Sequence, residues 1–216
     1  MKLLNSFGPN PRMVRMFLHE KGLDLEKVEH DLMGAENRAA PYTSKNPGGQ
    51  MPALETDGGD VIAETVVICD YLEELHPEPA LIGANALERA EARMWNRRIE
   101  QRITEHMYAG FRFSVGLGMF KGRMYCMPDA ADDFKAAAQD GLTWLDGLLG
   151  DNDYLCGERL TIGDMVLFCC VDFAAKTGQT IPAELSNLTA WYERMAARPS
   201  ASASLHPAAA KVGMQG

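Results

Sequence analysis

Apolar residues in the first 76 positions switch between a spacing typical of strands and one typical of helices. LEKVEHDL alternates apolar and polar residues as a half-buried strand does, whereas Met13, Val14, Phe17 and Leu18 recur at helical spacing. The predicted elements are strands at 2–7 and 25–32, helices at 11–21 and 64–75, a weaker helix or irregular turn at 35–45, and a hairpin of strands at 51–55 and 60–64. This βαβαββα order predicts a small mixed sheet flanked by helices.

After the segment HPEPALIGAN the pattern becomes helical, and Gly, Asp, Asn and Pro mark the loops. The predicted helices span 86–120, 128–149, 162–177 and 187–197. The change of pattern predicts two domains, residues 1–78 and 86–216, joined by a linker at 79–85. The Ala/Ser-rich end, SASASLHPAAAKVGMQG, predicts a loosely ordered tail.

The composition is that of an ordinary globular protein, with 46% hydrophobic and 24% charged residues among 216. A net charge of −9 disfavours binding to nucleic acid or to an anionic membrane surface. The first 80 residues hold 14 acidic but only 7 basic residues, so the acidity lies in the first domain. Because no apolar run could span a bilayer and MKLLNSFGPN lacks the apolar core of a signal peptide, we expect a cytoplasmic protein.

The five cysteines form no CxxC pair and no metal-ligand spacing with the five histidines, so we expect no metal site. Cys69, Cys169 and Cys170 lie in apolar periodic segments. This placement favours packing in the core over redox chemistry, with the thiols reduced.

The stretch NPGGQMPALE places Pro52 where a loop should become a strand. Inside a strand the proline would delete a ladder hydrogen bond, so we expect it at a strand start or an edge. If the Met51–Pro52 bond is cis, the N–H and C=O of Met51 would face outward and could pair with a ligand peptide as an added strand does. The alternative is a trans proline that opens a strand, since only about 5% of X-Pro bonds are cis.

The ordered set NPGGQMPALE, AETVVICDYLEELHP, LTIGDMVLF and AWYERMAARPS resembles the cytosolic glutathione transferases, in particular their bacterial nu-like and theta-like members. The resemblance covers nearly the whole chain. It implies an α/β plus all-α protein: a thioredoxin-like βαβαββα N-terminal domain followed by an all-helical C-terminal domain. It also implies a cis proline and glutathione as co-substrate, with no metal.

By this resemblance, Met51, next to Pro52, pairs through its backbone with the cysteinyl unit of glutathione, while Glu64 and Thr65 bind the γ-glutamyl end. The helix start at Thr65 would offer N–H groups and a dipole that attract a carboxylate, and Glu64 could accept from the ligand ammonium. The alternative is that Glu64 and Thr65 only cap the helix.

The resemblance places polar or basic side chains at the glycine end of glutathione. Gln50 and either Asn37 or Arg38 fall at these positions, and Arg38 is favoured for a carboxylate because its guanidinium donates two parallel hydrogen bonds. Lys45 is a weaker candidate, since a single lysine is usually a solvated surface charge.

A thiol with a pKa near 8.5 needs help to ionise at neutral pH. The family supplies a Tyr, Ser or Cys near the first helix, but SFGPNPRMVR contains no Tyr or Cys, and Ser6 falls within the predicted strand. Asn10 resembles the asparagine of nu-like members, and its amide could stabilise the thiolate. Equally, Asn10 before Pro11 could be an ordinary N-cap.

Some relatives without the usual residue hold a water near the sulfur with groups from the helical domain. The segment EHMYAGFRFSVG offers Tyr108 and Ser114, which with Ser6 are the reserve candidates for thiol activation. Family members that carry out dithiol chemistry keep a cysteine near the first helix. Its absence from this sequence favours conjugation.

In the second domain, Thr161 and Asp164 form the sequence pattern of a capping box, and we interpret them as structural. Arg89, Arg93 and Arg97 recur every four residues, which alone indicates a solvated face but by resemblance suits a homodimer interface with the acidic domain. Some of the following residues could line an apolar electrophile site, although most should be core: Met94, Met107, Met119, Met124, Met127, Tyr108, Phe111, Phe113 and Phe120.

Together these inferences predict a homodimeric, cytoplasmic glutathione S-transferase, a transferase of alkyl or aryl groups with a role in detoxification. It would activate the thiol of glutathione for attack on a small apolar electrophile. Two alternatives stay open: a non-catalytic binding or regulatory protein with the same fold, and a glutathione-dependent peroxidase.

Overall fold

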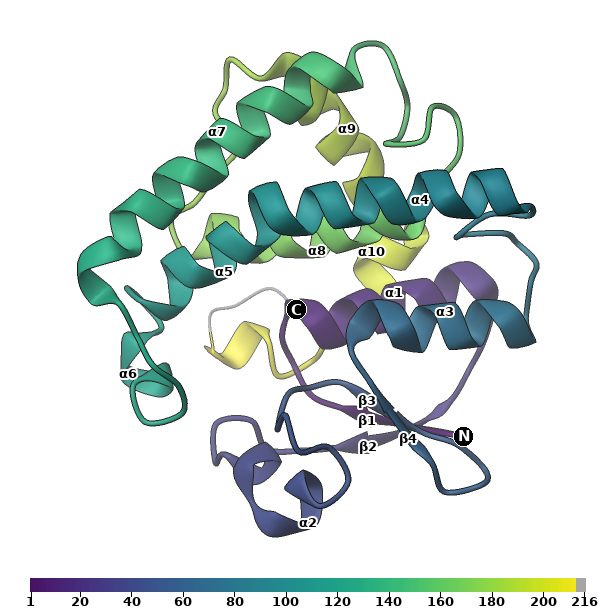
Figure 1. Cartoon of the computed structure of the whole chain (residues 1–216), viewed down its shortest axis with the longest axis vertical. Coiled ribbons are helices and arrows are strands. Elements are labelled where there is room, and N and C mark those ends of the chain that lie inside the picture. The colour runs from purple at the N-terminus through teal and green to yellow at the C-terminus, as the bar shows by residue number, and fades with distance from the viewer. Residues whose placement is uncertain (213–216) are drawn as a thin grey trace. The chain divides into compact units, whose positions relative to one another are not determined.

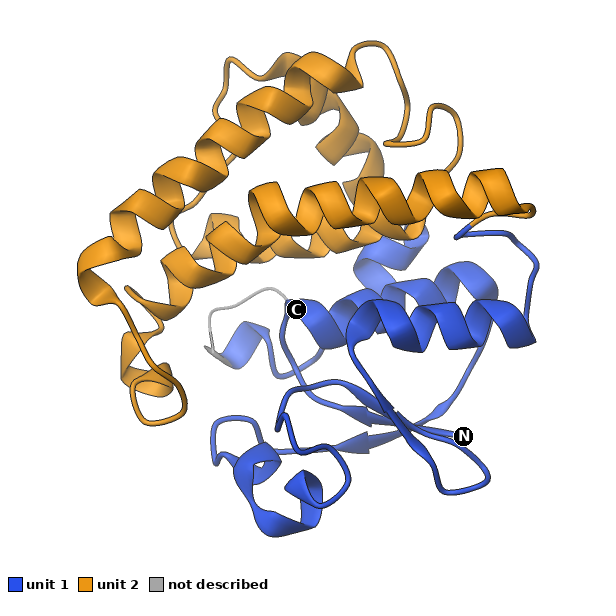
Figure 2. Cartoon of the chain, in the orientation of Figure 1, with its two compact units in different colours: residues 1–82, 199–216 blue, residues 83–198 orange. Residues whose placement is uncertain are grey.

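The structure is a computed structural model that describes residues 1–212. It divides into two compact units (Figure 2): unit 1 comprises Met1–Ile82 and the C-terminal segment from Pro199, and unit 2 comprises Gly83–Arg198. The domain boundaries at 78 and 86 stay a prediction. The compact units differ from that prediction mainly in grouping the C-terminal segment with the first unit.

Unit 1 has the predicted βαβαββα order, followed by two short C-terminal helices (Figure 1). Its elements are β1 Lys2–Asn5, α1 Pro9–Lys21, β2 Glu26–Glu29, the 3₁₀ helix η1 Glu36–Arg38, α2 Ala40–Thr43, β3 Ala53–Glu55, β4 Val61–Ala63, α3 Thr65–Leu75, α10 Pro199–Ala203 and the 3₁₀ helix η4 Ala210–Val212. The predicted turn or weak helix at 35–45 is therefore two short helices.

The four strands form one sheet in the order β2-β1-β3-β4. β2 runs parallel to β1, whereas β3 runs antiparallel to both β1 and β4. β2 is shorter and more exposed than predicted, with only Val28 half-buried, because it lies at an edge of the sheet. The hairpin between β3 and β4 closes through Thr56 N–H to the carbonyl of Asp60.

The C-terminal segment packs on α1 and is not the loosely ordered tail that its composition predicts. Ser200, Ala201, Ser204 and Ala209 are buried in unit 1. The predicted tail was wrong for the part that the structure describes because buried arginines of α1 bind the backbone of this segment. Residues 213–216 of that tail lie outside the described residues.

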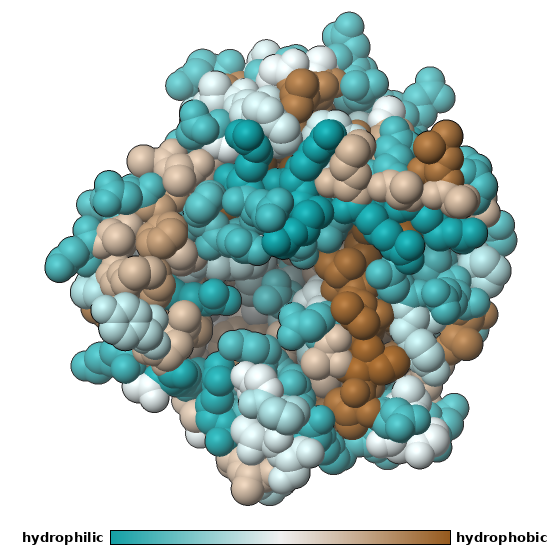
Figure 3. Space-filling view, in the orientation of Figure 1, coloured by the Kyte–Doolittle hydropathy of each residue, from teal (hydrophilic) through white to brown (hydrophobic). Residues whose placement is uncertain are grey.

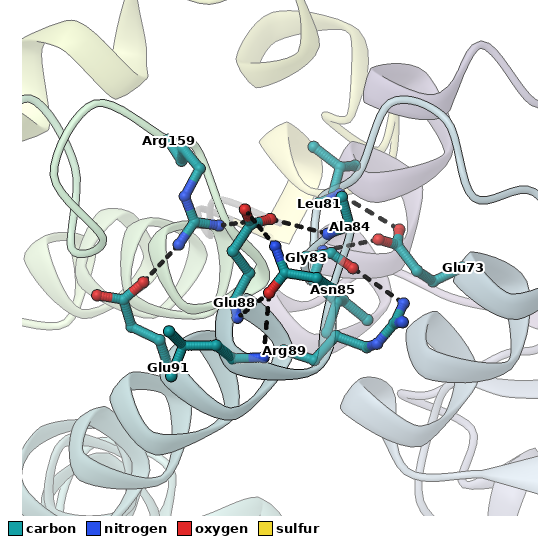
Figure 4. A network of polar contacts seen from close by, with 11 residues as sticks. Glu73, Leu81, Gly83, Ala84, Asn85, Glu88, Arg89, Glu91 and Arg159 are labelled. Atoms are coloured by element: carbon teal, nitrogen blue, oxygen red, sulfur yellow. Dashed lines mark hydrogen bonds and ion pairs between the residues drawn. The ribbon is translucent and has the colours of Figure 1, made fainter.

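A buried ion pair closes the end of unit 1 before Gly83. Lys21 at the end of α1 pairs with Glu73 of α3 and also donates to the carbonyl of His76. The Glu73 carboxylate accepts from the backbone N–H groups of Leu81 and Ile82, as Figure 4 shows for Leu81. These contacts fix the chain that follows α3.

Unit 2 is built entirely from helices. They are α4 Ala86–Ile99, the π-helical turn η2 Glu100–Thr104, α5 Glu105–Arg112, α6 Leu117–Phe120, the 3₁₀ helix η3 Pro128–Ala130, α7 Ala131–Leu149, α8 Ile162–Lys176 and α9 Ser186–Ala196. The helix predicted over 86–120 breaks at 113–116, where the N–H of Gly116 bonds to the carbonyl of Phe111. No helix among residues 1–212 is both long and apolar enough to cross a membrane.

Polar contacts fix the N-terminal half of α4. Asn85 caps α4 by accepting from the N–H groups of Leu87 and Glu88. Arg159 forms ion pairs with Glu88 and Glu91 of α4 (Figure 4). These contacts join the loop before α8 to α4.

The capping box pattern of Thr161 and Asp164 is present at the start of α8. Asp164 is fully buried and accepts four hydrogen bonds, from Thr161 N–H and hydroxyl, from Leu155 N–H and from the indole of Trp191. The carboxylate thus ties α8 to the preceding loop and to α9.

Candidate functional site

The Met51–Pro52 peptide bond is cis, and β3 begins one residue later, at Ala53. Pro52 therefore precedes the strand. Within residues 1–212, neither the N–H nor the C=O of Met51 takes part in a hydrogen bond. Its side chain is buried in a core cluster with Leu4, Tyr42 and Ala53. The residue is anchored by its side chain while its main-chain polar groups have no partner in the described part of the chain.

The loop before Met51 is held by side chains from η1 and α2. The Gln50 carbonyl accepts from the Tyr42 hydroxyl and from Asn46 Nδ2 at 2.9 Å. Asn37 Nδ2 donates to the Gly49 carbonyl at 2.6 Å. Gly49 has φ of 59°, where a side chain is strained, and a Cβ there would lie 3.1 Å from the Asn37 carbonyl. The loop conformation is thus set before any ligand binds.

At the start of α3 the backbone of Glu64 has an unusual conformation. The N–H groups of the first turn have no acceptor within the helix. Glu64 occupies the N-cap position with φ of 70° and makes no side-chain cap. The alternative that Glu64 and Thr65 only cap the helix is therefore wrong for Glu64, whose exposed side chain makes no cap hydrogen bond, and Thr65 is the first helical residue and not the N-cap. Non-glycine residues with positive φ cluster at ligand sites.

The register of the sheet brings three predicted parts of the site to one end. β3 and β4 pair Ala53 with Ala63, and β1 and β3 pair Leu4 with Ala53. Because both pairings are antiparallel, the start of β3 lies beside the end of β1 and the end of β4. The bare main chain of Met51, the start of α3 and the turn into α1 therefore lie at the same edge of unit 1.

The candidates for the glycine end differ in their surroundings. Asn37 is only 1% exposed, and its amide donates to the Gly49 carbonyl, so its role in the described structure is to brace the loop. Arg38 is half-buried and donates to the Gly48 carbonyl at 3.3 Å, while Gln50 is exposed beside Met51. Lys45 is ion-paired with Glu55. Arg38 and Gln50 are the better placed for a carboxylate.

Gly8, with φ of 122°, is the N-cap of α1, and the helix starts at Pro9, whose restricted φ suits the first turn. Asn10 is a half-buried residue inside that first turn. The interpretation of Asn10 as the N-cap is therefore wrong. Ser6 is buried, and its hydroxyl donates to the His30 carbonyl at 2.9 Å, which engages its proton.

The two remaining reserve candidates belong to unit 2. Ser114 follows α5 and donates to the Gly110 carbonyl of that helix. Burial raises the pKa of Tyr108 well above its ordinary value, and the phenol contacts the Cys170 thiol, whose pKa burial raises to about 12. Tyr108 therefore stays protonated at neutral pH, and the Arg112 guanidinium lies 5.6 Å from its ring centre.

A cavity of about 300 Å³ opens elsewhere in unit 1, between the sheet and the segment of η1 and α2. Its lining residues are Lys2, Leu4, Val28, His30, Glu36, Ala39, Pro41, Tyr42, Lys45 and Glu55. Its charged groups are paired, as in His30 with Glu36 and Lys45 with Glu55. Met51, Glu64 and Thr65 are not among its lining residues, although Leu4 and Tyr42 of the core cluster around Met51 are.

Sequence reasoning missed the buried side chains that support this edge. Arg12 and Arg15 are 2% and 4% exposed, and Asn5 is 1% exposed. The signal was their position within the apolar helix segment PRMVRMF, but arginine is so rarely buried that this pattern is normally assigned to the surface.

Comparison with known proteins connects both units to one family. Residues 7–75 match the family model for the glutathione S-transferase N-terminal domain, and residues 128–194 match that for its C-terminal domain. The chain is 31% identical to Glutathione S-transferase 2 of Saccharomyces cerevisiae over 196 residues, which is 89% of this chain and 84% of the yeast protein.

Solved structures give the same result. A glutathione S-transferase domain-containing protein of Marinobacter aquaeolei VT8 has a TM-score of 0.88 and 35% identity, over 93% of this chain and 100% of that one. One relative is named for a different property: FtsZ-localized protein A of Caulobacter vibrioides is 28% identical over 88% of this chain and 84% of its own.

Proposed function

Because the chain belongs to the glutathione S-transferase family, we propose that it binds glutathione at the edge of unit 1 marked by Met51 and transfers the glutathionyl group to an apolar electrophile. The observation that carries the proposal is the main chain of Met51. Its N–H and C=O have no partner among residues 1–212 although its side chain is buried, which is the arrangement that an added peptide strand needs.

The two ends of the tripeptide find complementary groups on either side of Met51. The γ-glutamyl carboxylate would lie at the first turn of α3, where N–H groups and the helix dipole favour an anion. The exposed Glu64 carboxylate would accept from the γ-glutamyl ammonium. Arg38 and Gln50 would bind the glycine carboxylate from the opposite end, with the loop between them braced by Asn37.

The thiol would be activated at the start of α1, which the sheet register brings to the same edge as Met51. Pro9 and Pro11 have no N–H and the Arg12 N–H donates to the Gly8 carbonyl, so the stabilising group in the first turn would be Asn10, through its backbone N–H and side-chain amide, neither of which titrates. The thiolate then attacks an electrophilic carbon, so that an S–C bond forms and the leaving group departs with its electron pair. The thiol proton is released to solvent.

The test combines binding with chemistry. Thr65→Val keeps the volume of the first residue of α3 but removes its hydroxyl, and we expect weaker binding of glutathione by calorimetry, by about three- to tenfold for one lost hydrogen bond. Thr43→Val removes a hydroxyl that donates to the carbonyl of Ala39, the N-cap of the same helix, and serves as the matched control. Wild-type protein that neither binds glutathione nor conjugates it to a dinitrophenyl chloride would contradict the proposal.

The non-catalytic alternative is kept because one relative, FtsZ-localized protein A, is not named as a transferase. The discriminating measurement is the ultraviolet absorbance of the thiolate on adding glutathione. Binding together with a thiolate band at neutral pH supports the transferase, whereas binding without that band favours a binding module. Reduction of cumene hydroperoxide in place of conjugation would favour the peroxidase.

We also propose that the protein is a homodimer. Figure 3 shows a mostly polar face crossed by one apolar strip, which lies over the edge strand β4 and the start of α3. The apolar residues there are the half-buried Val61, Ile62 and Val66 and the exposed Val67. An uncovered apolar edge favours association with a second copy. A monomeric mass in sedimentation at micromolar concentration would contradict this proposal.

A further inference from the structure

Two arginines of α1 are buried beside the turn that leads from β1 into this helix. Arg12 is 2% exposed and Arg15 is 4% exposed. A guanidinium is rarely removed from water unless several hydrogen bonds compensate it. Neither side chain belongs to the set of glutathione contacts proposed above. Their hydrogen bonds therefore indicate what these charges do.

Arg15 joins the end of β1 to the C-terminal segment. One terminal nitrogen, Nη1, donates to Asn5 Oδ1 at 2.9 Å and to the Ser6 carbonyl at 2.8 Å. Its Nε donates to the Ser204 carbonyl at 2.8 Å. A planar, rigid fork of donors can serve three acceptors in these directions, whereas the single ammonium of a lysine cannot.

Arg12 makes a different set of contacts. It donates to the Ala201 carbonyl at 3.0 Å and from Nε to the Ser204 hydroxyl at 3.4 Å. These contacts hold the C-terminal segment, but they do not reach the turn at Ser6. Both arginines therefore anchor the C-terminal segment, and Arg15 in addition holds the turn at Ser6.

A second row of contacts holds the same turn from the side of β2. Asn5 Nδ2 donates to one oxygen of Glu29 at 2.6 Å, and the other Glu29 oxygen lies 2.9 Å from His206 Nε2. The ring of His206 is 6.5 Å from that of Phe7, measured between centroids. The turn at residues 6–8 is thus enclosed by β2, by Arg15 and by the segment that follows Pro199.

We infer that Arg15 is a positioning residue for thiol activation, an inference that rests on the function proposed above. β1 leads into the turn at the end of the sheet where Met51 and Pro52 precede β3, so the turn that Arg15 fixes also sets where the first turn of α1 meets a sulfur bound at Met51. Arg15 acts through Asn5 and Ser6 and not by contact with glutathione. Small displacements of such supporting groups weaken electrostatic stabilisation strongly.

The test measures the pKa of the thiol of bound glutathione from the thiolate absorbance as a function of pH. In Arg15→Lys we expect the pKa of the bound thiol to rise by about one unit. Below the pKa this lowers the fraction of thiolate about tenfold. Binding of S-methylglutathione, which has no thiol, should change by less than about twofold. Arg15→Lys keeps the charge and loses the geometry, whereas Arg15→Gln loses both. We expect a shift of similar size in Arg15→Gln, because the geometry and not the charge sets the pKa of the thiol.

Ser204→Ala is the matched control. It removes the hydroxyl that Arg12 uses but leaves the carbonyl that Arg15 uses, so the thiol pKa should stay at the wild-type value. Circular dichroism verifies that each variant folds. If the Arg15 variants do not fold, Asn5→Ser shortens one acceptor of Arg15 and should raise the thiol pKa in the same direction by a smaller amount.

Three results would overturn the inference: an unchanged thiol pKa in folded Arg15→Lys, a shift in Arg15→Gln alone, which would indicate a charge effect, or an equal shift in Ser204→Ala. Wild-type protein that shows no thiolate band would instead contradict the proposed function. The wild-type titration therefore separates failure of the function from failure of the inference.

Discussion

Replacing Asp164 with alanine should cost far more stability than the loss of an ordinary helix cap. The buried carboxylate accepts from Thr161 and also from Leu155 N–H and the Trp191 indole, at 2.9 and 3.0 Å. The cap contributes about 1 kcal/mol. Each buried donor left unsatisfied costs about 1–3 kcal/mol, partly offset because the variant no longer buries a charge.

These terms give an expected loss of about 4 kcal/mol in the free energy of unfolding, equal to a decrease of about 10 °C in Tm for a chain of this size. Urea denaturation followed by tryptophan fluorescence measures it. Asp172→Ala, on the same helix, is the matched control, because Asp172 is half-buried and accepts from the Tyr192 hydroxyl, and it should cost about 1 kcal/mol. A loss below about 1 kcal/mol in Asp164→Ala would refute this reasoning.

The same carboxyl predicts a pH dependence. Burial raises the pKa of Asp164 above its ordinary 3.8, against the lowering effect of its hydrogen bonds. Because the folded state then holds the proton more tightly than the unfolded state, the linked stability is fully present below the unfolded-state pKa and is lost as pH rises through the folded-state pKa. The difference in stability between wild type and Asp164→Ala should therefore grow as pH falls through this range. A constant difference would contradict the raised pKa.

Three further predictions concern buried groups. Lys21→Met leaves Glu73 buried without its ion pair and should lower the free energy of unfolding by about 3–5 kcal/mol, measured by urea denaturation. A loss under about 1 kcal/mol would show that water replaces the lysine. Gly141→Ala should lower Tm, because a Cβ there would lie 2.3 Å from the Arg102 carbonyl, and an unchanged Tm would mean that the helices separate without cost. Cys170, with a pKa of about 12, should stay unmodified by a disulfide reagent at pH near 8 in folded protein; rapid modification before unfolding would contradict its burial.

Local patterns predicted the parts of the fold that depend on neighbours in sequence. The alternation of strand and helix spacings gave the order of elements in unit 1, and Pro52 was correctly placed before a strand. The capping pattern of Thr161 and Asp164 is local as well, because its two residues are three positions apart. Such elements can be predicted from the sequence because they depend on the backbone geometry of a few neighbouring residues.

Contacts between distant parts of the chain were not predictable in the same way. Arg15 bonds to the carbonyl of Ser204, 189 positions away, and this contact orders a segment whose composition predicts a loose tail. The N-cap of α1 was not predicted correctly either, because the cap is Gly8 and not Asn10. A positive φ at Glu64 has no sequence signature because glutamate rarely adopts it.

Hydrogen exchange at the Met51 amide tests the central claim most directly. This amide has no partner among residues 1–212, so in the protein alone it should exchange quickly compared with the paired amides of β3. Saturation with S-methylglutathione should slow its exchange at least about tenfold, because a bound peptide would accept from it. Unchanged exchange at Met51 in a glutathione-saturated protein would contradict the account, since the ligand would then bind somewhere else.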